Sequence, residues 1–221
     1  PELEVGPLFA DRFEVSNGEF KSFVDDKGYQ DDSLWDREAL PLRRHFVDST
    51  PGAPQPGPRT WLQGSYGDTG NRDRPVAGVT YWEARAYAAW LSRESGARWR
   101  LPSEREWRVL GAYDPASGNL QSFPWGDEFR PEHLPRLSQP RLVGSNGADR
   151  SPLGVHDLGG NLAEWVLLPD ARPAVKGAAF AFGPRVAEHF ANLQTTGTPG
   201  PTPPPEALAA IGFRLVREVP Q

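Results

Sequence analysis

The side chains that could carry out chemistry are few and widely separated along the chain. The four histidines are His45, His133, His156 and His189, and no pair of them has the short spacing typical of a metal site. The sequence contains no cysteine and no methionine, so it offers no thiolate nucleophile, no disulfide and no soft sulfur ligand. It also contains no nucleophile elbow, phosphate-binding glycine loop or His-Glu-x-x-His pattern.

Two neighbouring acids, Glu104 and Glu106, are better explained by structure than by catalysis. They follow Ser103 at the start of an apolar helical pattern, where acids complement the helix dipole and complete a capping box. Two similar capping boxes begin at Ser16 and Thr80. The helices that follow them are predicted to end at Gly28 and near Gly96, respectively. The sequence therefore predicts three helices, and their apolar residues would position the rest of the fold.

Short strands are predicted at 9–15, 175–182 and 211–217. The Pro-rich tracts 49–58 and 197–205 are predicted as surface loops of one domain spanning 1–221, because recognisable pieces of that domain flank each tract. The formal net charge is −5, and no basic face or long apolar run is present. We therefore predict no nucleic-acid partner and no membrane span. Abundant Pro and Arg without Cys or Met would suit a heat-tolerant protein.

Six blocks of the sequence follow one another in a characteristic order. They are Asp11–Asn17, Arg74–Ala84, Arg100–Trp107, Phe123–Asp127, Leu153–Trp165 and Ile211–Arg214. Together these blocks resemble the motifs of the formylglycine-generating enzyme (sulfatase-modifying factor) family. The resemblance implies an α+β fold, a variant of the C-type lectin fold with a small twisted antiparallel sheet, two main helices and many long loops.

The same resemblance indicates that the family's oxidase chemistry is missing here. Oxidising members bind copper with two cysteines that follow a Gly-rich strand, and the matching positions are Phe182 and Ala187. Cu(I) requires thiolate or thioether ligands, which this chain lacks. A second enzymatic branch uses non-haem iron with histidines from a separate domain, and the scattered histidines here do not match it. We therefore predict no copper and that the chain is not an enzyme.

The resemblance also implies one structural Ca²⁺ site in the loop after Val155. The implied ligands are the carboxylates of Asp157 and Glu164 and the backbone carbonyls of Gly160 and Leu162, because Ca²⁺ prefers several oxygens in a flexible arrangement. The alternative is that Asn161 and Glu164 hydrogen-bond within the loop and that no ion is bound.

The segment between Lys176 and Ile211 differs most from the sequences of the enzymes in the family, and it is predicted to form a ligand-binding face. Its candidate residues are Ala181, Phe182, Pro184, Arg185, Val186, His189, Phe190, Asn192, Thr195 and Thr196. Exposed aromatic and Arg side chains suit a binding hot spot, whereas the alternative is that the phenylalanines fill the core. For Phe180 we favour the core.

This segment is also similar to the variable region of diversity-generating retroelement proteins, which share the fold and end in a comparable Ile-Gly-Phe-Arg strand. The leading hypothesis is a non-catalytic display domain whose face at about 180–210 binds a protein or another macromolecule. The alternatives are a sensor or accessory domain of a kinase or complex, and a divergent enzyme of the family.

Overall fold

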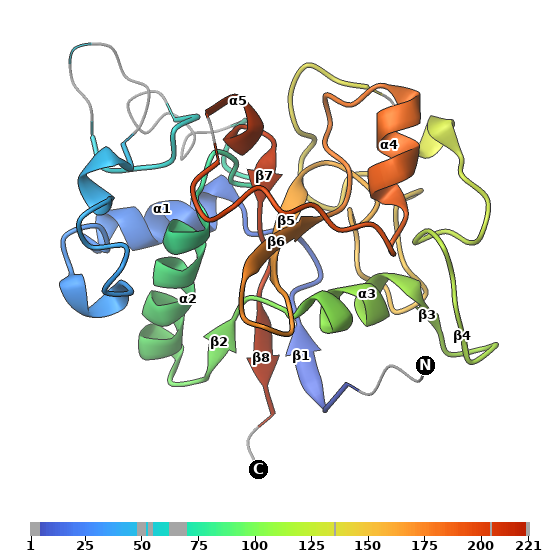
Figure 1. Ribbon diagram of the computed structural model, residues 1–221, viewed down its shortest axis with the longest axis horizontal. Helices are drawn as coiled ribbons and strands as arrows, with labels where there is room; N and C mark the ends of the chain where they lie inside the picture. Colours follow the sequence, from blue (N-terminus) through green and yellow to red (C-terminus); the bar gives the residue numbers. More distant parts are fainter. Residues whose placement is uncertain are drawn as a thin grey trace.

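The computed structural model describes residues 5–47, 52, 55–61, 70–134, 136–203 and 205–219 (Figure 1). Its α-helices are α1 (Asn17–Asp25), α2 (Tyr81–Ser95), α3 (Glu104–Ala112), α4 (Pro184–Ala191) and α5 (Pro205–Leu208). Its 3₁₀ turns are η1 (Asp32–Leu34), η2 (Arg43–His45) and η4 (Pro131–His133). Its strands are β1 (Leu8–Ala10), β2 (Trp99–Arg100), β3 (Tyr113–Asp114), β4 (Asn119–Leu120), β5 (Ala163–Leu167), β6 (Pro173–Lys176), β7 (Ile211–Gly212) and β8 (Val216–Glu218).

The three predicted helices are confirmed, and each begins at its predicted capping box. In α2 the Glu83 N–H donates to the Thr80 hydroxyl at 3.2 Å, while the Glu83 carboxylate accepts from the Thr80 N–H at 2.7 Å. The boxes of α1 and α3 have the same reciprocal pattern. Helix α2 ends at Gly96, whose left-handed φ of 68° favours glycine. Local sequence therefore determines where these helices begin.

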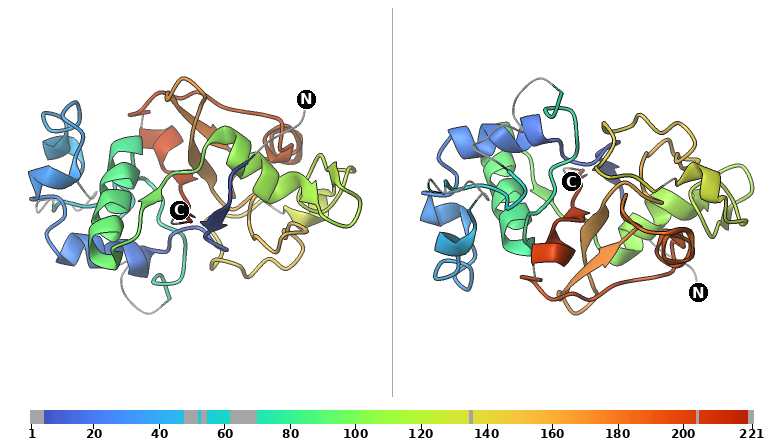
Figure 2. Two further views of the ribbon diagram at one scale, coloured as in Figure 1. Left: turned by 90° about the horizontal axis from the view of Figure 1, so that it is seen from below. Right: turned by 90° about the horizontal axis from the view of Figure 1, so that it is seen from above.

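The strands form two small three-stranded sheets and one short hairpin. One sheet has the order β1-β8-β2 and is antiparallel, and the other has the order β6-β5-β7 with β5 and β7 parallel. The α+β architecture predicted from the sequence is thus confirmed. Helices α1 and α2 lie on one side of the central strands, and α3 and α4 lie on the other (Figure 1 and Figure 2).

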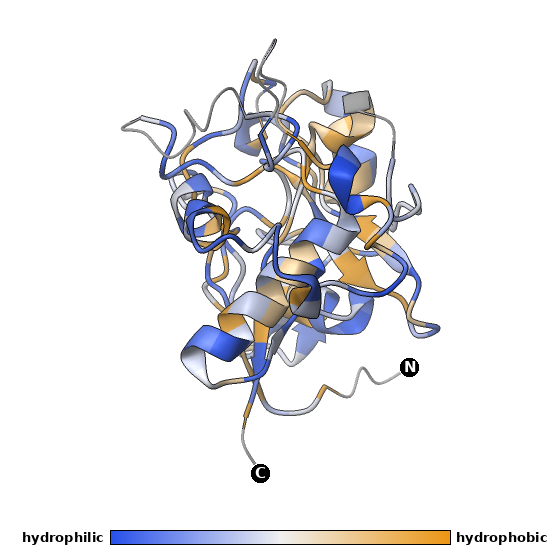
Figure 3. Cartoon of the chain, turned by 90° about the vertical axis from the view of Figure 1, so that its left-hand side faces the viewer, coloured by the Kyte–Doolittle hydropathy of each residue, from blue (hydrophilic) through white to orange (hydrophobic). Residues whose placement is uncertain are grey.

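The core is built largely from aromatic rings. Trp61, Trp107 and Trp165 are fully buried, as is Phe20 at the centre of a cluster that joins α1 to α2. The buried indole N–H of Trp165 donates to the Val79 carbonyl at 3.0 Å, as a buried polar group requires. Figure 3 shows hydrophobic residues concentrated on the inner strands and hydrophilic residues on the outer turns.

Three strand predictions need correction. The predicted strand 9–15 ends at Ala10, the last residue of β1. The predicted strand 175–182 ends at Lys176, because Gly177 takes a positive φ of 86° and turns the chain out of the sheet. The predicted strand 211–217 is divided between β7 and β8, which belong to different sheets. Half of the Pro-rich tract 49–58 lies outside the described residues. No helix in the described part of the chain is long and apolar enough to cross a membrane.

Candidate functional site

The C-terminal segment forms helix α4 and the turns on either side of it. Gly183 precedes the helix and Pro184 occupies its first turn, where the missing proline N–H costs nothing. Ala187 and Ala191 face inward and are buried, and the side chain of Leu193 is also fully buried just after the helix. These three small or apolar side chains fix α4 on the body of the protein, so its other face is free to contact a ligand.

The predicted ligand-binding residues divide into two groups by exposure. Those that are exposed are Ala181, Pro184, Arg185, Val186 and His189, and those that are half-buried are Phe182, Phe190, Asn192, Thr195 and Thr196. The structure brings three rings together: Phe182 lies 5.6 Å from Phe190, and His189 lies 4.9 Å from Phe190, between ring centroids. Phe180 is half-buried rather than sealed in the core.

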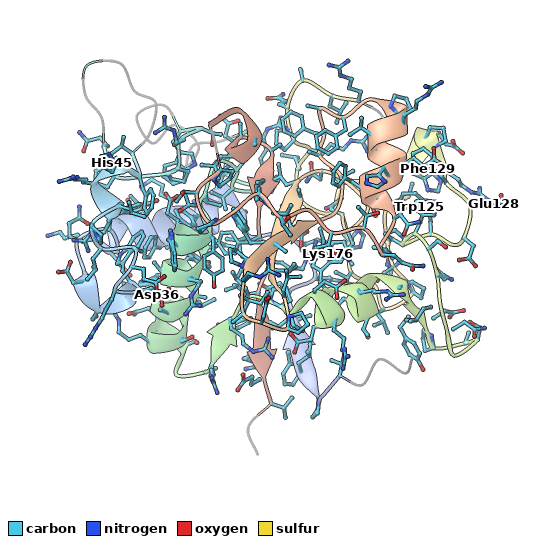
Figure 4. The ribbon with its side chains drawn as sticks, in the orientation of Figure 1. Asp36, His45, Trp125, Glu128, Phe129 and Lys176 are labelled. Atoms are coloured by element: carbon cyan, nitrogen blue, oxygen red, sulfur yellow. The ribbon has the colours of Figure 1, made fainter. Side chains whose placement is uncertain are left out.

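A second aromatic group from the loop before η4 extends this surface. The half-buried Trp125 stacks on Phe123 at 5.6 Å with an interplanar angle of 8°, and Phe129 packs against Phe123 at the same distance. This group and the α4 rings belong to one hydrophobic cluster. Figure 4 shows Trp125, Glu128 and Phe129 beside α4. We call Phe182, His189, Phe190, Trp125 and Phe129 the α4 face. Trp125 and Phe129 were not among the predicted ligand-binding residues, although Trp125 lies within the recognised Phe123–Asp127 block and Phe129 lies two residues after it.

The predicted calcium ligands do not share one site in this structure. Asp157 and Gly160 line a cavity of about 20 Å³, together with Asn161, whereas Leu162 and Glu164 do not line it. Glu164 instead forms a fully buried ion pair with Arg214 at 2.6 Å. The described residues contain no group of three or more His, Asp or Glu side chains that could hold a metal ion. A Ca²⁺ at this loop would depend on Asp157 without Glu164, and the calcium site stays a prediction.

Several buried carboxylates surround Arg214, and burial dominates their electrostatics. Burial, together with the negative charge of Asp157, raises the pKa of Asp149 to about 7. Burial also raises the pKa of Asp157 to about 6 and that of Glu14 well above its usual value. Glu14 still accepts hydrogen bonds from the Asn161 side chain at 2.7 Å and the Leu162 N–H at 3.0 Å. These acids anchor the loop internally.

The copper site of the family does not fit the residues present. Phe182 and Ala187 stand where the two cysteines would be required, and neither can ligate copper. The four histidines do not converge either, because His45 lies on the opposite side of the molecule from α4, the helix that carries His189 (Figure 1 and Figure 4). The residues at these positions therefore do not form a copper site.

Lys176 fixes the position at which the α4 segment leaves the sheet. Its buried ammonium donates to Glu104 at 2.9 Å and to the Thr196 hydroxyl at 3.3 Å, and it lies over the Trp107 ring at 5.5 Å. Burial lowers the pKa of Lys176, and the Glu104 carboxylate opposes that effect. Figure 4 shows Lys176 at the centre of the molecule, where it ties β6 to α3.

The fold and this loop-rich site define a C-type lectin-like domain. PvdO from Pseudomonas aeruginosa has a similar structure, with a TM-score of 0.64 at 21% identity over 96% of this chain and 81% of that one. The sulfatase-modifying factor enzyme 1-like domain family matches residues 2–219, so the chain belongs to that family. The resemblance drawn from six sequence blocks is thereby confirmed.

Two relatives illustrate the range of the family. Hercynine oxygenase of Mycobacterium tuberculosis is 35% identical over 162 residues, which cover 72% of this chain and 37% of that protein. The Mus musculus protein named inactive C-alpha-formylglycine-generating enzyme 2 is 31% identical over 193 residues, covering 74% of this chain and 59% of that protein. This chain therefore spans only part of the length of either relative.

These relatives overturn the prediction that the chain is not an enzyme. Relatives at 35% and 37% identity are named hercynine oxygenase, which places the chain in an enzymatic family. The prediction drew too much from the missing cysteines. Their absence excludes copper–thiolate chemistry, but a reaction that uses other ligands, or residues from another domain, is still possible.

Proposed function

We propose that this chain is the ligand-recognition domain of an enzyme of the formylglycine-generating enzyme family, and that the α4 face binds the ligand. The observation that carries the proposal is the contiguous group of partly exposed rings at Phe182, His189 and Phe190. Aromatic side chains provide large contact areas with little conformational entropy to lose, and they dominate binding hot spots.

The charges around the α4 face favour a ligand that carries a cation. Asp127, Glu128, Glu132 and Glu188 are exposed on the segments that carry the aromatic rings, and Arg130 and Arg185 add two positive charges there, which leaves these segments net negative. Aromatic faces attract quaternary ammonium groups, and nearby carboxylates reinforce that attraction. A betaine, with one cationic and one anionic end, matches this pattern. Hercynine is the first candidate, because relatives at 35% and 37% identity are named for it.

Calorimetric titration with hercynine tests this proposal, with histidine as the matched ligand that lacks the trimethylammonium group. We expect hercynine to bind more tightly than histidine, and Phe190→Ala to weaken hercynine binding about tenfold, as expected for loss of one hot-spot ring. Phe9→Ala is the control, because Phe9 is a 52% exposed ring on β1, outside the α4 face. Equal affinity for the two ligands, or equal losses in the two variants, would contradict the proposal.

A diversified ligand-binding face is a second candidate, favoured by the way α4 is anchored. The buried Ala187, Ala191 and Leu193 hold the helix, so the outward residues between them can change without disturbing the core. Sequencing this segment in sister isolates tests the idea. Substitutions clustered at 181–196, with Ile211–Arg214 constant, support it, and a segment as constant as the rest contradicts it.

A further inference from the structure

Two arginines from distant parts of the sequence meet at a tight turn outside the α4 face. The turn runs from Ser151 to Val155 and is closed by backbone hydrogen bonds from Ser151 N–H to Val155 O and from Gly154 N–H to Ser151 O, both 2.8 Å. Arg12 follows β1, and its Nε donates to the Gly154 carbonyl at 3.2 Å. Arg150 enters the same turn directly.

Both guanidinium groups approach Gly154. The Nη2 atoms of Arg150 and Arg12 lie 3.5 Å and 3.6 Å from the position that a β-carbon on Gly154 would occupy. Gly154 has a φ of 81°, which favours glycine, so no side chain enters the space between the two cations. We propose that Arg12, Arg150 and His156 form a binding site for an oxyanion, either a phosphate or a carboxylate group.

The charges of the two arginines are not neutralised by their neighbours. Each follows an acid in the sequence, but both acids turn inward: Asp11 accepts from the Leu215 N–H at 3.1 Å, and Asp149 accepts from the Gly159 N–H at 3.0 Å. Within the described part of the chain, the Arg150 side chain has no hydrogen-bond partner, and the Arg12 side chain donates only to the Gly154 carbonyl. Two like charges held close together repel one another, and a shared anion removes that cost.

His156 supplies a third polar group at the same place. Its backbone N–H donates to the Arg12 carbonyl at 3.0 Å. Burial and the nearby positive charges of Arg150 and Arg12 lower the pKa of His156, as expected for an imidazole that lies close to both arginines. Its Nδ1 is buried and has no hydrogen-bond partner among the described residues, which is rare for a buried polar atom. A ligand oxygen can therefore satisfy His156 as well as both guanidinium groups.

The surroundings of this oxyanion site indicate the kind of molecule that carries the anion. Phe13 is 37% exposed and its ring centroid lies 5.3 Å from that of His156, while Leu153 is 44% exposed on the turn itself. These apolar side chains suit an anion attached to a hydrocarbon or ring. Guanidinium forks bind both carboxylate and phosphate with paired hydrogen bonds, so oxyanion geometry is the shared recognition element.

Titrations monitored by NMR test the oxyanion site, with inorganic phosphate in one arm and citrate in the other. The signals to follow are the Gly154 amide and the side-chain Nε–H groups of Arg12 and Arg150. We expect saturable chemical-shift changes with at least one anion. The anion that binds more tightly shows whether the site prefers a phosphate or a carboxylate group. Arg12→Gln and Arg150→Gln should each weaken binding about tenfold, as for loss of one charge-assisted contact. Both side chains are exposed, so the variants should fold.

Arg105→Gln is the matched control, because Arg105 is exposed on α3 and belongs to neither proposed site. Binding that survives in this control and is lost in Arg12→Gln and Arg150→Gln supports the site. Dissociation constants above about 10 mM for both anions, corresponding to negligible affinity, overturn it. Equal weakening of anion binding in all three variants also overturns the proposed site, because the loss would then follow from the change in net charge alone.

Discussion

Glu83 provides a test of the buried electrostatics in the half of the molecule away from α4. Its side chain is 1% exposed, and it accepts from the Tyr29 hydroxyl at 2.5 Å and from the Thr80 N–H at 2.7 Å. Burial raises its pKa from 4.5 to about 7, although these hydrogen bonds oppose the shift. Because the folded pKa lies above the unfolded value, the stabilisation is complete below pH 4.5 and is lost as the pH rises through 7.

The expected size of this effect follows from the shift. One pKa unit corresponds to about 1.4 kcal/mol, so the titration of Glu83 should lower the free energy of unfolding by about 3 kcal/mol between acid and alkaline pH. Glu83→Gln keeps the shape and an acceptor oxygen but cannot ionise. The free energy of unfolding can be measured by urea titration with Trp fluorescence at pH 5 and pH 8.5. Its fall between these two pH values should be smaller for the variant than for the unmodified protein, by about 3 kcal/mol.

Glu19→Gln is the matched control, because Glu19 occupies the same capping-box position in α1 but is exposed. Its pH dependence should equal that of the unmodified protein. The reasoning is refuted if Glu83→Gln retains the full pH dependence, since the proton would then be taken up elsewhere. The other buried acids with raised pKa values, among them Asp149, titrate in both proteins and cancel in the comparison.

Three further predictions concern the core and the loop after Val155. Glu164→Gln should lower the free energy of unfolding by about 3–5 kcal/mol in urea titrations, because it leaves the Arg214 charge buried and unpaired; a loss below 1 kcal/mol would contradict this. Gly177→Ala should cost about 1–3 kcal/mol through its φ of 86° and a β-carbon 3.1 Å from the Leu158 carbonyl. Gly118→Ala, at a similar φ in open space, should cost less, and equal losses would refute the steric contribution. Calcium should raise the melting temperature relative to chelator if the predicted site at Asp157 exists, and an unchanged melting temperature rules it out.

The parts of the fold that the sequence predicts are those governed by nearby residues. The capping boxes at Ser16, Thr80 and Ser103 each place a hydroxyl and a carboxylate three residues apart, which is sufficient to locate a helix start. Gly96 then ends α2 through its left-handed conformation. Each signal needs only a few consecutive residues, so tertiary structure was not required to interpret it.

Helix α4 was not predicted because tertiary packing stabilises it. It has eight residues and no side-chain cap, and its inward side chains are the small Ala187 and Ala191. Ala187, Phe190 and Ala191 do share one helical face, but so short a helix becomes stable only when that face packs against the aromatic cluster around Phe123. The candidate residues of the ligand-binding face were therefore selected by composition, and their arrangement required the structure.

The long-range polar contacts were also beyond sequence reasoning. Glu164 and Arg214 both lie in recognised blocks, but nothing local indicates that they pair across 50 residues. The ion pair of Glu164 with Arg214 was therefore not anticipated, and the predicted role of Glu164 as a calcium ligand stays a prediction. Arg12 and Arg150 likewise meet only through the folding of the turn at Gly154.

The most direct test of the central claim is an NMR titration of the isotope-labelled chain with hercynine, with every backbone amide followed. The expected result is saturable shifts concentrated at 180–196 and 123–134, the segments that form the α4 face, with much smaller shifts elsewhere. Saturable shifts centred on another surface, or no shifts when the same titration is carried out with hercynine in large excess, would contradict the assignment of ligand recognition to α4.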